Sequence, residues 1–428
     1  MEIKGAEKIT GTIEIPGDKS ISHRSAILSA MTSQKVIIRN FLFSEDCLST
    51  LEVLKKLQIK IIIENQSITV YGRGMDGLSE PDDILYVGNS GTTIRLISGL
   101  LAAAPFMSVL NGDSSINRRP MDRIIEPLRQ MGAAIYGRNN NRFAPLVIMG
   151  GKKLMAKQFN IPVASAQVKS CLLIAALNCK GTTEISQPAV SRDHTERMLQ
   201  YFGADIKFDG QHSEIDSGSQ IRGKDIFVPG DISSAAYFIV ACLILDDSHI
   251  ALRDVGINQT RSYFLKILMD MGADIRIKNK RTLNNEPVAD IEVFSSKLQA
   301  IPIDKENIPN IIDEIPILCV AASKARGKTA ITGAGELRHK ESDRINAVYS
   351  QFLKMGVDIS QEPDGLTIKG DPDFRPAYAR LKSFGDHRIA MSCAILSLLG
   401  KEEAVIDDTG CINTSFPGFF DKLNKHIR

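Results

Sequence analysis

Carboxylates and cations occur together at three places in the C-terminal half of the sequence. The densest stretch is Arg338-His339-Lys340-Glu341-Ser342-Asp343-Arg344, with Asp313-Glu314 before it and Asp386-His387-Arg388 after it. A reaction that moves protons on a multiply anionic substrate needs both kinds of group, because cations hold the substrate and keep the carboxylates ionised until a proton moves. For any one residue a surface ion-pair network is the alternative. Three clusters at corresponding places favour a catalytic site.

Three segments of the N-terminal half carry residue types that bind phosphate or carboxylate. Lys19 and Ser20 stand at an expected helix start, with Arg24 about one turn further in. Gly88-Asn89-Ser90-Gly91-Thr92-Thr93 resembles a turn that cradles phosphate. Arg118-Arg119 precede a helix that we expect to open with Pro120. For Lys19, Ser20 and Arg24 the alternative is a capping serine with solvated basic neighbours, and for Arg118-Arg119 it is a solvated basic loop.

Two further charged segments are predicted to be structural. Within Arg192-Asp193-His194-Thr195-Glu196-Arg197, we favour a mutually neutralised helix start for Glu196 and Arg197. Gly327-Lys328-Thr329 lacks the glycine that a Walker loop has five positions earlier, where Ala322 stands. We therefore interpret it as a turn.

The composition is that of a globular protein with enough length for two domains. Of the 428 residues, 43% are hydrophobic and 24% are charged, and the formal net charge is +2, which gives no bulk reason to expect a nucleic-acid or membrane partner. The longest apolar run, 235–245, is too short to cross a bilayer, and no leader-like segment comes first, so we expect a cytoplasmic protein. Seven cysteines stand singly, as buried thiols and not metal ligands.

A repeated phrase indicates how the chain is organised. Segments 131–135, 202–206, 271–275 and 355–359 share a glycine followed by a strand-like end, with the glycines 71, 69 and 84 residues apart, and 57–61 is a degenerate copy. Each copy is typical of a helix end, a glycine and a strand. A second phrase, a small-residue helix followed by a β-branched strand, interleaves at six places. We infer about six units of roughly 70 residues in an α/β fold.

The first helices of these units begin alike. Their starts carry capping residues at Gly17 to Arg24, Gly88 to Arg95, Ala164 to Lys169, Gly230 to Ser234, Asn310 to Glu314 and Gly385 to Arg388. Free backbone N–H groups and the positive end of the dipole make each start suitable for an anion. If the units are related by pseudo-symmetry, several starts converge on one anionic substrate.

Six of these segments, in this order, resemble the EPSP synthase family, the 3-phosphoshikimate 1-carboxyvinyltransferases. They are Pro16 to Arg24, Gly88 to Arg95, Arg119-Pro120-Met121, Val163 to Ser170, Lys340 to Arg344 and Asp386 to Met391. The resemblance implies transfer of the enolpyruvyl group of phosphoenolpyruvate to the 5-hydroxyl of shikimate 3-phosphate, with release of phosphate, in the shikimate pathway to aromatic amino acids. It implies no metal and no organic cofactor.

The resemblance also implies the fold. We expect two similar domains of three βαβαββ units each, an inside-out α/β barrel, with the active site in the cleft between them. One domain would comprise residues 19–228, and the other residues 1–18 with 229–428. A monomer is expected, with glyphosate as an inhibitor.

Site residues follow from the resemblance, position by position. Shikimate 3-phosphate would be bound by Lys19, Ser20, Arg24, Ser165, Ala166, Gln167, Arg192, Asp313 and Lys340. Phosphoenolpyruvate would be bound by Lys19, Gly91, Arg119, Gln167, Arg344 and Arg388. Addition of the hydroxyl to C2, with protonation of C3, would precede loss of phosphate. Asp313, Glu341 and Lys19 are the expected catalytic groups, and the division of proton transfer between Asp313 and Glu341 stays open.

Four positions resemble the second class of these synthases. They are Ala166 in place of a serine, Arg192 in a Ser-Arg-Asp-His segment, Glu336 in place of an asparagine and Thr414 in place of a lysine.

Two other functions are considered. Enolpyruvyl transfer to UDP-N-acetylglucosamine is disfavoured by Ser20, where that family has asparagine, and by Ser114, where it has cysteine. A non-catalytic anion-binding repeat protein is disfavoured because it gains nothing from Asp313 and Glu341.

Overall fold

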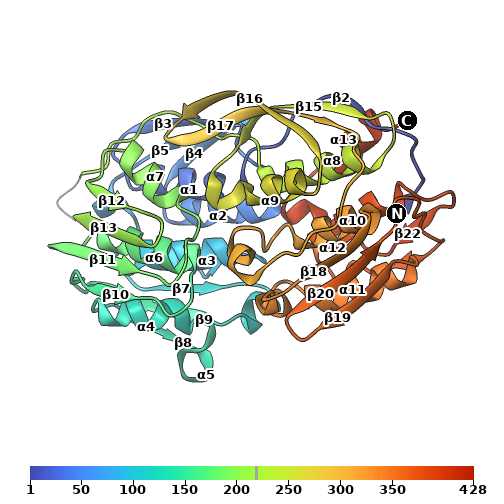
Figure 1. Ribbon diagram of the computed structural model, residues 1–428. Coiled ribbons are helices and arrows are strands. Elements are labelled where there is room, and N and C mark those ends of the chain that lie inside the picture. Colours follow the sequence, from blue (N-terminus) through green and yellow to red (C-terminus); the bar gives the residue numbers. More distant parts are fainter. Residues whose placement is uncertain (217–219) are drawn as a thin grey trace. The chain divides into compact units, whose positions relative to one another are not determined.

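The computed structural model describes residues 1–216 and 220–428, and the chain divides into two compact units. Unit 1 comprises Met1–Pro16, Pro229–Arg281 and Pro287–Arg428. Unit 2 comprises Gly17–Val228 together with Thr282–Glu286. Each unit is built from three small sheets and a set of buried helices (Figure 1).

Unit 2 holds three four-stranded sheets, in the orders β14-β3-β5-β4, β6-β7-β9-β8 and β10-β11-β13-β12. The strands are β3 (Lys35–Arg39), β4 (Lys60–Glu64), β5 (Ser67–Tyr71), β6 (Leu85–Tyr86), β7 (Ser108–Asn111), β8 (Ala134–Gly137), β9 (Phe143–Met149), β10 (Gln158–Asn160), β11 (Thr182–Ser186), β12 (Ile206–Phe208), β13 (His212–Asp216) and β14 (Ile226–Phe227). The α-helices are α1 (Lys19–Ala30), α2 (Glu45–Lys56), α3 (Gly91–Leu101), α4 (Asp122–Gln130), α5 (Arg138–Asn141), α6 (Ala166–Ala176) and α7 (His194–Tyr201). Short 3₁₀ helices are η1 (Met75–Gly77) and η2 (Ile116–Arg118).

Unit 1 repeats this plan with the sheets β16-β17-β15-β2, β18-β20-β19 and β1-β22-β21. The strands are β1 (Glu2–Ile3), β2 (Thr10–Ile13), β15 (His249–Gly256), β16 (Asp274–Leu283), β17 (Glu286–Phe294), β18 (Gly327–Ile331), β19 (Asp358–Glu362), β20 (Gly365–Gly370), β21 (Arg380–Leu381) and β22 (Ala404–Ile406). The α-helices are α8 (Ile232–Ile244), α9 (Gln259–Asp270), α10 (Ile315–Lys324), α11 (Arg344–Lys354), α12 (His387–Ser397) and α13 (Phe419–His426), and the 3₁₀ helices are η3 (Lys305–Asn310), η4 (Gly335–His339) and η5 (Gly410–Thr414).

The cores lie around helices that are buried on nearly all sides. In unit 2, α3 packs against both α1 and α6, and in unit 1, α10 packs against both α8 and α12. Every residue of α8 and of α12 is buried. The surrounding strands alternate buried and exposed residues, as in β11 and β13. A helix that is hydrophobic all round must be enclosed, so the helices lie inside and the sheets outside. This arrangement confirms the predicted α/β repeat, with separate open sheets in the described part of the chain.

The repeated phrase has one backbone conformation. Gly132, Gly203, Gly272 and Gly356 follow helices α4, α7, α9 and α11 with φ between +86° and +100°. In the degenerate copy, Gln58 takes the same place with φ +65°. Left-handed φ suits glycine because a Cβ clashes there. Five helix ends therefore turn into their strands in the same way.

Three local predictions are wrong. Helix α4 begins at Asp122, so Pro120 lies two residues before the helix and not in its first turn. Residues 327–329 begin strand β18 and are not a turn, since Lys328 pairs with Lys369 of β20. The start of α10 has no side-chain cap, because the Glu314 carboxylate accepts a hydrogen bond from Ser233 instead.

No helix in residues 1–216 and 220–428 is both long and apolar enough to cross a bilayer. All seven cysteines are free thiols, six of them buried. Burial raises the pKa of the Cys171 and Cys319 thiols to about 12, so these side chains behave as small apolar groups.

Candidate active site

Arg24 is a buried cation of unit 2 that is bound only by neutral oxygens. Its side chain comes from the second turn of α1, and the residue is 2% exposed. Nε donates to Thr195 Oγ1 at 2.7 Å, one terminal nitrogen donates to Ser170 Oγ at 2.8 Å, and the other donates to the carbonyl of Ser20 at 2.9 Å. Within the described residues, no carboxylate lies within ion-pair distance. Burial, which removes the charge from water, lowers the pKa of Arg24 to about 10.

The two helices whose hydroxyls bind Arg24, α6 and α7, are also joined by a buried ion pair. Lys169 Nζ of α6 is 2.6 Å from Glu196 Oε1 of α7, and the two side chains are 1% and 0% exposed. Glu196 also accepts a hydrogen bond from Ser213 at 3.1 Å. Glu196 and Arg197 do not neutralise each other as predicted, because Arg197 pairs with Asp193 at 2.9 Å. No local sequence pattern indicates a partner 27 residues away.

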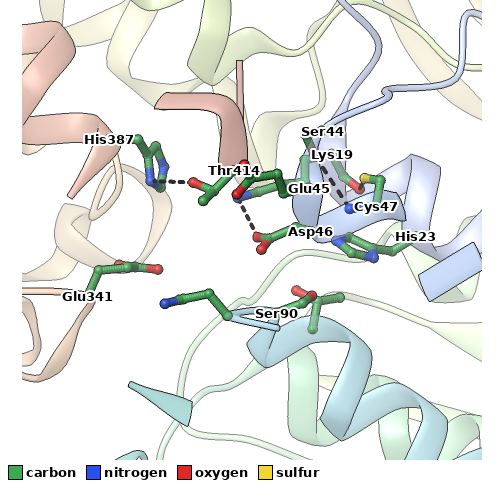
Figure 2. Close-up of polar contacts among 12 residues, drawn as sticks. Lys19, His23, Ser44, Glu45, Asp46, Cys47, Ser90, Glu341, His387 and Thr414 are labelled. Atoms are coloured by element: carbon green, nitrogen blue, oxygen red, sulfur yellow. Dashed lines mark hydrogen bonds and ion pairs between the residues drawn. The ribbon is translucent and has the colours of Figure 1, made fainter. Parts of the chain in front are cut away.

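Lys19 begins α1 and reaches α2. Lys19 Nζ donates to Asp46 Oδ2 at 3.1 Å, and Figure 2 shows this bond. Asp46 lies in the first turn of α2, which Ser44 caps. The two side chains are 20% and 15% exposed, so the pair is accessible to solvent and to a ligand. Asp46 was not predicted as a site residue. An acidic residue at a helix start has the same sequence pattern whether it contacts a ligand or only stabilises the helix.

Gly91 is the first residue of α3, where two guanidiniums converge. A Cβ on Gly91 would lie 2.9 Å from a terminal nitrogen of Arg95 and 3.1 Å from one of Arg119. Arg119 donates to Asn89 Oδ1 at 2.8 Å and to Ser115 Oγ at 3.1 Å. The missing side chain of Gly91 thus lets two cations approach the start of α3 closely, and a pair of guanidiniums suits a small anion.

Gln167 belongs to the same group of residues. Arg95 donates to Gln167 Oε1 at 2.6 Å, and Gln167 Nε2 donates to Thr92 Oγ1 at 3.1 Å. The starts of α3 and α6 are therefore linked through Gln167. Arg95 was not predicted as a site residue, although its place four residues after Gly91 puts both on one helix face.

The remaining predicted residues of unit 2 lie at helix starts. Ser165 caps α6 by accepting from the Val168 N–H, and Ala166 is the first residue of that helix. Arg192 precedes α7 and lies close enough to Arg24 to lower the pKa of that guanidinium further. The structure thus gathers Ser20, Arg24 and Arg192, and separately Gly91, Arg119 and Gln167.

In unit 1, Arg344 joins three acidic side chains. This first residue of α11 is 1% exposed. It donates to Glu341 Oε2 at 2.6 Å, to Asp313 Oδ1 at 3.3 Å and to Asp386 Oδ2 at 2.8 Å. Burial opposes its charge, but the three carboxylates raise the pKa of Arg344 above its ordinary value. The two predicted proton-transfer residues, Asp313 and Glu341, are therefore held by one guanidinium.

Arg388 contacts the same group from α12. It donates to the Asp313 carbonyl at 2.7 Å and lies 3.7 Å from the Asp313 carboxylate and from Glu314. Asp386 caps this helix and is fully buried, and although burial opposes ionisation, Arg344 lowers the pKa of Asp386. Lys340 is partly buried immediately before Glu341. Asp313, Glu341, Arg344 and Arg388 thus form one cluster, and Lys340 is the residue before Glu341.

A second layer of polar side chains supports this cluster. Glu314 is 1% exposed and accepts a hydrogen bond from Ser233, which in turn accepts from Arg261 at 2.7 Å. Arg261 also pairs with Asp231, the cap of α8, at 3.1 Å. None of Ser233, Arg261 and Asp231 was predicted as a site residue. Across the described residues, no group of three or more His, Cys, Asp or Glu is placed to hold a metal ion.

Comparisons with known proteins identify the family. Residues 3–423 match the family model described as EPSP synthase (3-phosphoshikimate 1-carboxyvinyltransferase). The chain belongs to the EPSP synthase family. A 3-phosphoshikimate 1-carboxyvinyltransferase of Syntrophomonas wolfei is 50% identical over 416 residues, covering 97% of both chains. One of Petrotoga mobilis is 48% identical over 428 residues, covering 99% of both.

Solved structures agree on the fold. The EPSP synthase of Acinetobacter baumannii has a TM-score of 0.90 and 41% identity, and the match covers 99% of this chain and 97% of that one. The enolpyruvyl transferase NikO of Streptomyces tendae has a TM-score of 0.79 at 14% identity, covering 99% and 96%, which speaks for the fold alone. The predicted family and the predicted enolpyruvyl transferase fold are confirmed.

Proposed function

We propose that the cationic groups of unit 2 and the Arg344 cluster of unit 1 act in one reaction on shikimate 3-phosphate and phosphoenolpyruvate. As a member of the EPSP synthase family, the chain is a transferase that moves the carboxyvinyl group of phosphoenolpyruvate to the 5-hydroxyl of shikimate 3-phosphate and releases phosphate. This places it in the shikimate pathway to aromatic amino acids.

The observation that carries the proposal is Arg24. A buried cation without an anionic partner is costly, and proteins rarely keep one. Arg24 keeps its charge among neutral oxygens with a pKa of about 10, so it is still protonated at neutral pH. An anionic substrate group at Arg24 would supply the missing partner. We assign shikimate 3-phosphate to this place, with Lys19, Ser20, Ser165, Ala166, Gln167, Arg192, Asp313 and Lys340.

Phosphoenolpyruvate is assigned to Lys19, Gly91, Arg119, Gln167, Arg344 and Arg388. It carries a carboxylate and a phosphate, and arginine forks match both groups. The close approach of the Arg95 and Arg119 guanidiniums to Gly91 supports one end of this assignment. The pairing of Arg344 and Arg388 with Asp313 supports the other, because it brings cations and a proton acceptor together.

The mechanism is addition followed by elimination. C3 of phosphoenolpyruvate gains a proton, the 5-hydroxyl oxygen bonds to C2 and loses its proton, and phosphate then leaves as C3 returns its proton. We propose Asp313 as the acceptor of the hydroxyl proton, Glu341 as acid and base at C3, and Lys19 as the cation beside the bridging phosphate oxygen. Arg344 holds both carboxylates within hydrogen-bond distance, which supports their joint action.

The test is phosphate release from the purified chain with both substrates and no added metal. UDP-N-acetylglucosamine serves as a parallel acceptor. Release with shikimate 3-phosphate alone is the expected result. Release with UDP-N-acetylglucosamine alone would show that the chain transfers the enolpyruvyl group to that acceptor instead. Release with neither acceptor would favour a binding protein.

Three finer points belong to the proposal. Glyphosate is expected to inhibit competitively, since Gly91 adds no side chain beside Arg119. We also propose a monomer without nucleic-acid or membrane partners, which the net charge of +2 supports and sedimentation would test. A cytoplasmic location is supported by the seven free cysteines.

A further inference from the structure

The helices α6 and α7 are joined by two adjacent polar links. Lys169 and Ser170 are neighbours on α6, and Thr195 and Glu196 are neighbours on α7. Lys169 pairs with Glu196 at 2.6 Å, and the Ser170 and Thr195 hydroxyls share a hydrogen bond of 2.6 Å. All four side chains are buried. One link is thus ionic and the other is neutral.

Arg24 is bound at the neutral link. Its Nε–H reaches Thr195 and a terminal N–H reaches Ser170, so the two hydroxyls accept from one edge of the guanidinium. A planar guanidinium held at two points on one edge has a fixed orientation. A hydroxyl gives this orientation without cancelling the positive charge, whereas a carboxylate in its place would cancel it.

The ionic link explains why no carboxylate takes that place. Glu196 is the residue after Thr195, and its negative charge is near enough to raise the pKa of Arg24. Lys169 pairs with Oε1 of the Glu196 carboxylate at 2.6 Å, so the ammonium neutralises the negative charge of Glu196. Without Lys169, a fully buried Glu196 would have Arg24 as a neighbouring cation and a strong need for a partner.

We propose that Ser170 and Thr195 are positioning residues that orient Arg24 through neutral oxygens, and that Lys169 withholds Glu196 from Arg24 so that the guanidinium charge stays available to the substrate. The proposal rests on the assignment of Arg24 to shikimate 3-phosphate made above. It adds four buried residues that do not themselves touch the substrate.

The first experiment removes one hydroxyl. Thr195→Val keeps the shape of the side chain and deletes the acceptor for Nε. We expect the Kd of shikimate 3-phosphate, measured by calorimetry with the full chain, to rise about tenfold, the loss of one hydrogen bond to a charged group. Thr195→Ser, which keeps the hydroxyl, should restore most of the affinity. Thr183→Val is the matched control, because Thr183 is a buried threonine of β11 in the same unit and Arg24 has no bond to it.

The second experiment tests the ionic link by a double-mutant comparison. Lys169→Met leaves Glu196 charged, and we expect it to weaken shikimate 3-phosphate binding more than Thr195→Val does. Adding Glu196→Gln to Lys169→Met removes the competing negative charge and should lower the Kd again, although the ion pair is absent from both the single and the double variant. If binding recovers when this second native residue is replaced, the loss in Lys169→Met comes from charge competition and not from damage to the core.

Three results separate the possibilities. An unchanged Kd for Thr195→Val would overturn the positioning role of the two hydroxyls. Equal losses in Lys169→Met and in Lys169→Met with Glu196→Gln would overturn the role of Lys169. An unchanged Kd for Arg24→Gln would overturn the substrate assignment of Arg24 itself. Weak binding in Arg24→Gln with normal binding in Thr195→Val would leave that assignment standing and remove only the positioning role. Circular dichroism and unfolding midpoints would accompany every variant, and the Thr195 series decides the question if Lys169→Met does not fold.

Discussion

Replacing Arg344 by methionine should destabilise unit 1 strongly at neutral pH and much less in acid. Arg344 is 1% exposed and binds Asp386, Asp313 and Glu341. Removing one partner of a buried charge pair costs about 3–5 kcal/mol. Methionine fills similar space, so most of that cost would come from the carboxylates, above all Asp386, which is fully buried.

The pH dependence follows from the sign of the Asp386 shift. In the parent chain, Arg344 lowers the pKa of Asp386 in spite of burial, so this stabilisation is present above the unfolded value and is lost as the pH falls through the lowered one. In the variant, burial without the cation raises the pKa of Asp386 above its unfolded value. Protonation then relieves the variant as the pH falls. The difference in unfolding free energy is therefore largest near pH 7 and shrinks towards pH 4.

The assay is urea unfolding followed by far-ultraviolet circular dichroism at several pH values, since the chain has no tryptophan. Arg338→Met is the matched control, because Arg338 pairs with Asp343 at 2.8 Å but the side chains are 28% and 39% exposed. We expect that control to cost less than about 1 kcal/mol. A loss in Arg344→Met no greater than in Arg338→Met, or one that does not shrink with falling pH, would refute the reasoning.

Three shorter predictions concern other parts of the chain. Burial, together with Lys19 and Arg24, holds the pKa of His23 well below 6.5. The unfolding free energy should therefore fall as the pH drops below about 6.5, by up to about 1.4 kcal/mol per pH unit, and His23→Gln should flatten that part of a profile of unfolding midpoint against pH. Gly91→Ala should displace the guanidinium tips that lie 2.9 and 3.1 Å from the new Cβ and raise the KM for phosphoenolpyruvate more than that for shikimate 3-phosphate, whereas equal rises would point to general damage. Gln58→Gly should raise the unfolding free energy by about 0.5–1 kcal/mol, because glycine adopts the left-handed φ without strain. Gly203→Ala should lower the unfolding free energy by about 1 kcal/mol, although the new Cβ meets no neighbouring atom. Changes of the opposite sign would contradict the strain argument.

Local chemistry made much of the fold predictable. Caps and glycines depend on residues next to each other in the chain, so Asp18, Ser90 and Ser165 mark helix starts that the structure also has. The repeat was visible for the same reason, because every copy needs the same left-handed turn after its helix. Residues that act at a helix start, such as Lys19, were therefore within reach of the sequence.

Long-range electrostatics was beyond that reach. Glu196 stands beside Arg197 in the sequence, yet it pairs with Lys169 of another helix, because both are buried and a buried charge must find a partner wherever the fold places one. Glu314 likewise bonds Ser233, 81 residues away, instead of capping its own helix. Helical spacing contains no information on such pairs. The mainly apolar sequences of α6 and α10 made these pairs harder to predict, because a few polar residues in an apolar helix do not indicate which partner they bind.

The discontinuous make-up of unit 1 has a consequence for synthesis on the ribosome. Strand β2 is made early, but Thr10 of β2 pairs with His249 of its parallel partner β15. At about 5–20 residues per second, the N-terminal strand waits roughly 12–48 s before its neighbour is translated. Residues 17–228 are complete by then, so most of unit 2 has the opportunity to fold before unit 1 closes its first sheet. A nascent chain halted near residue 240 should consequently protect unit 2 from protease while residues 1–16 remain open to cleavage.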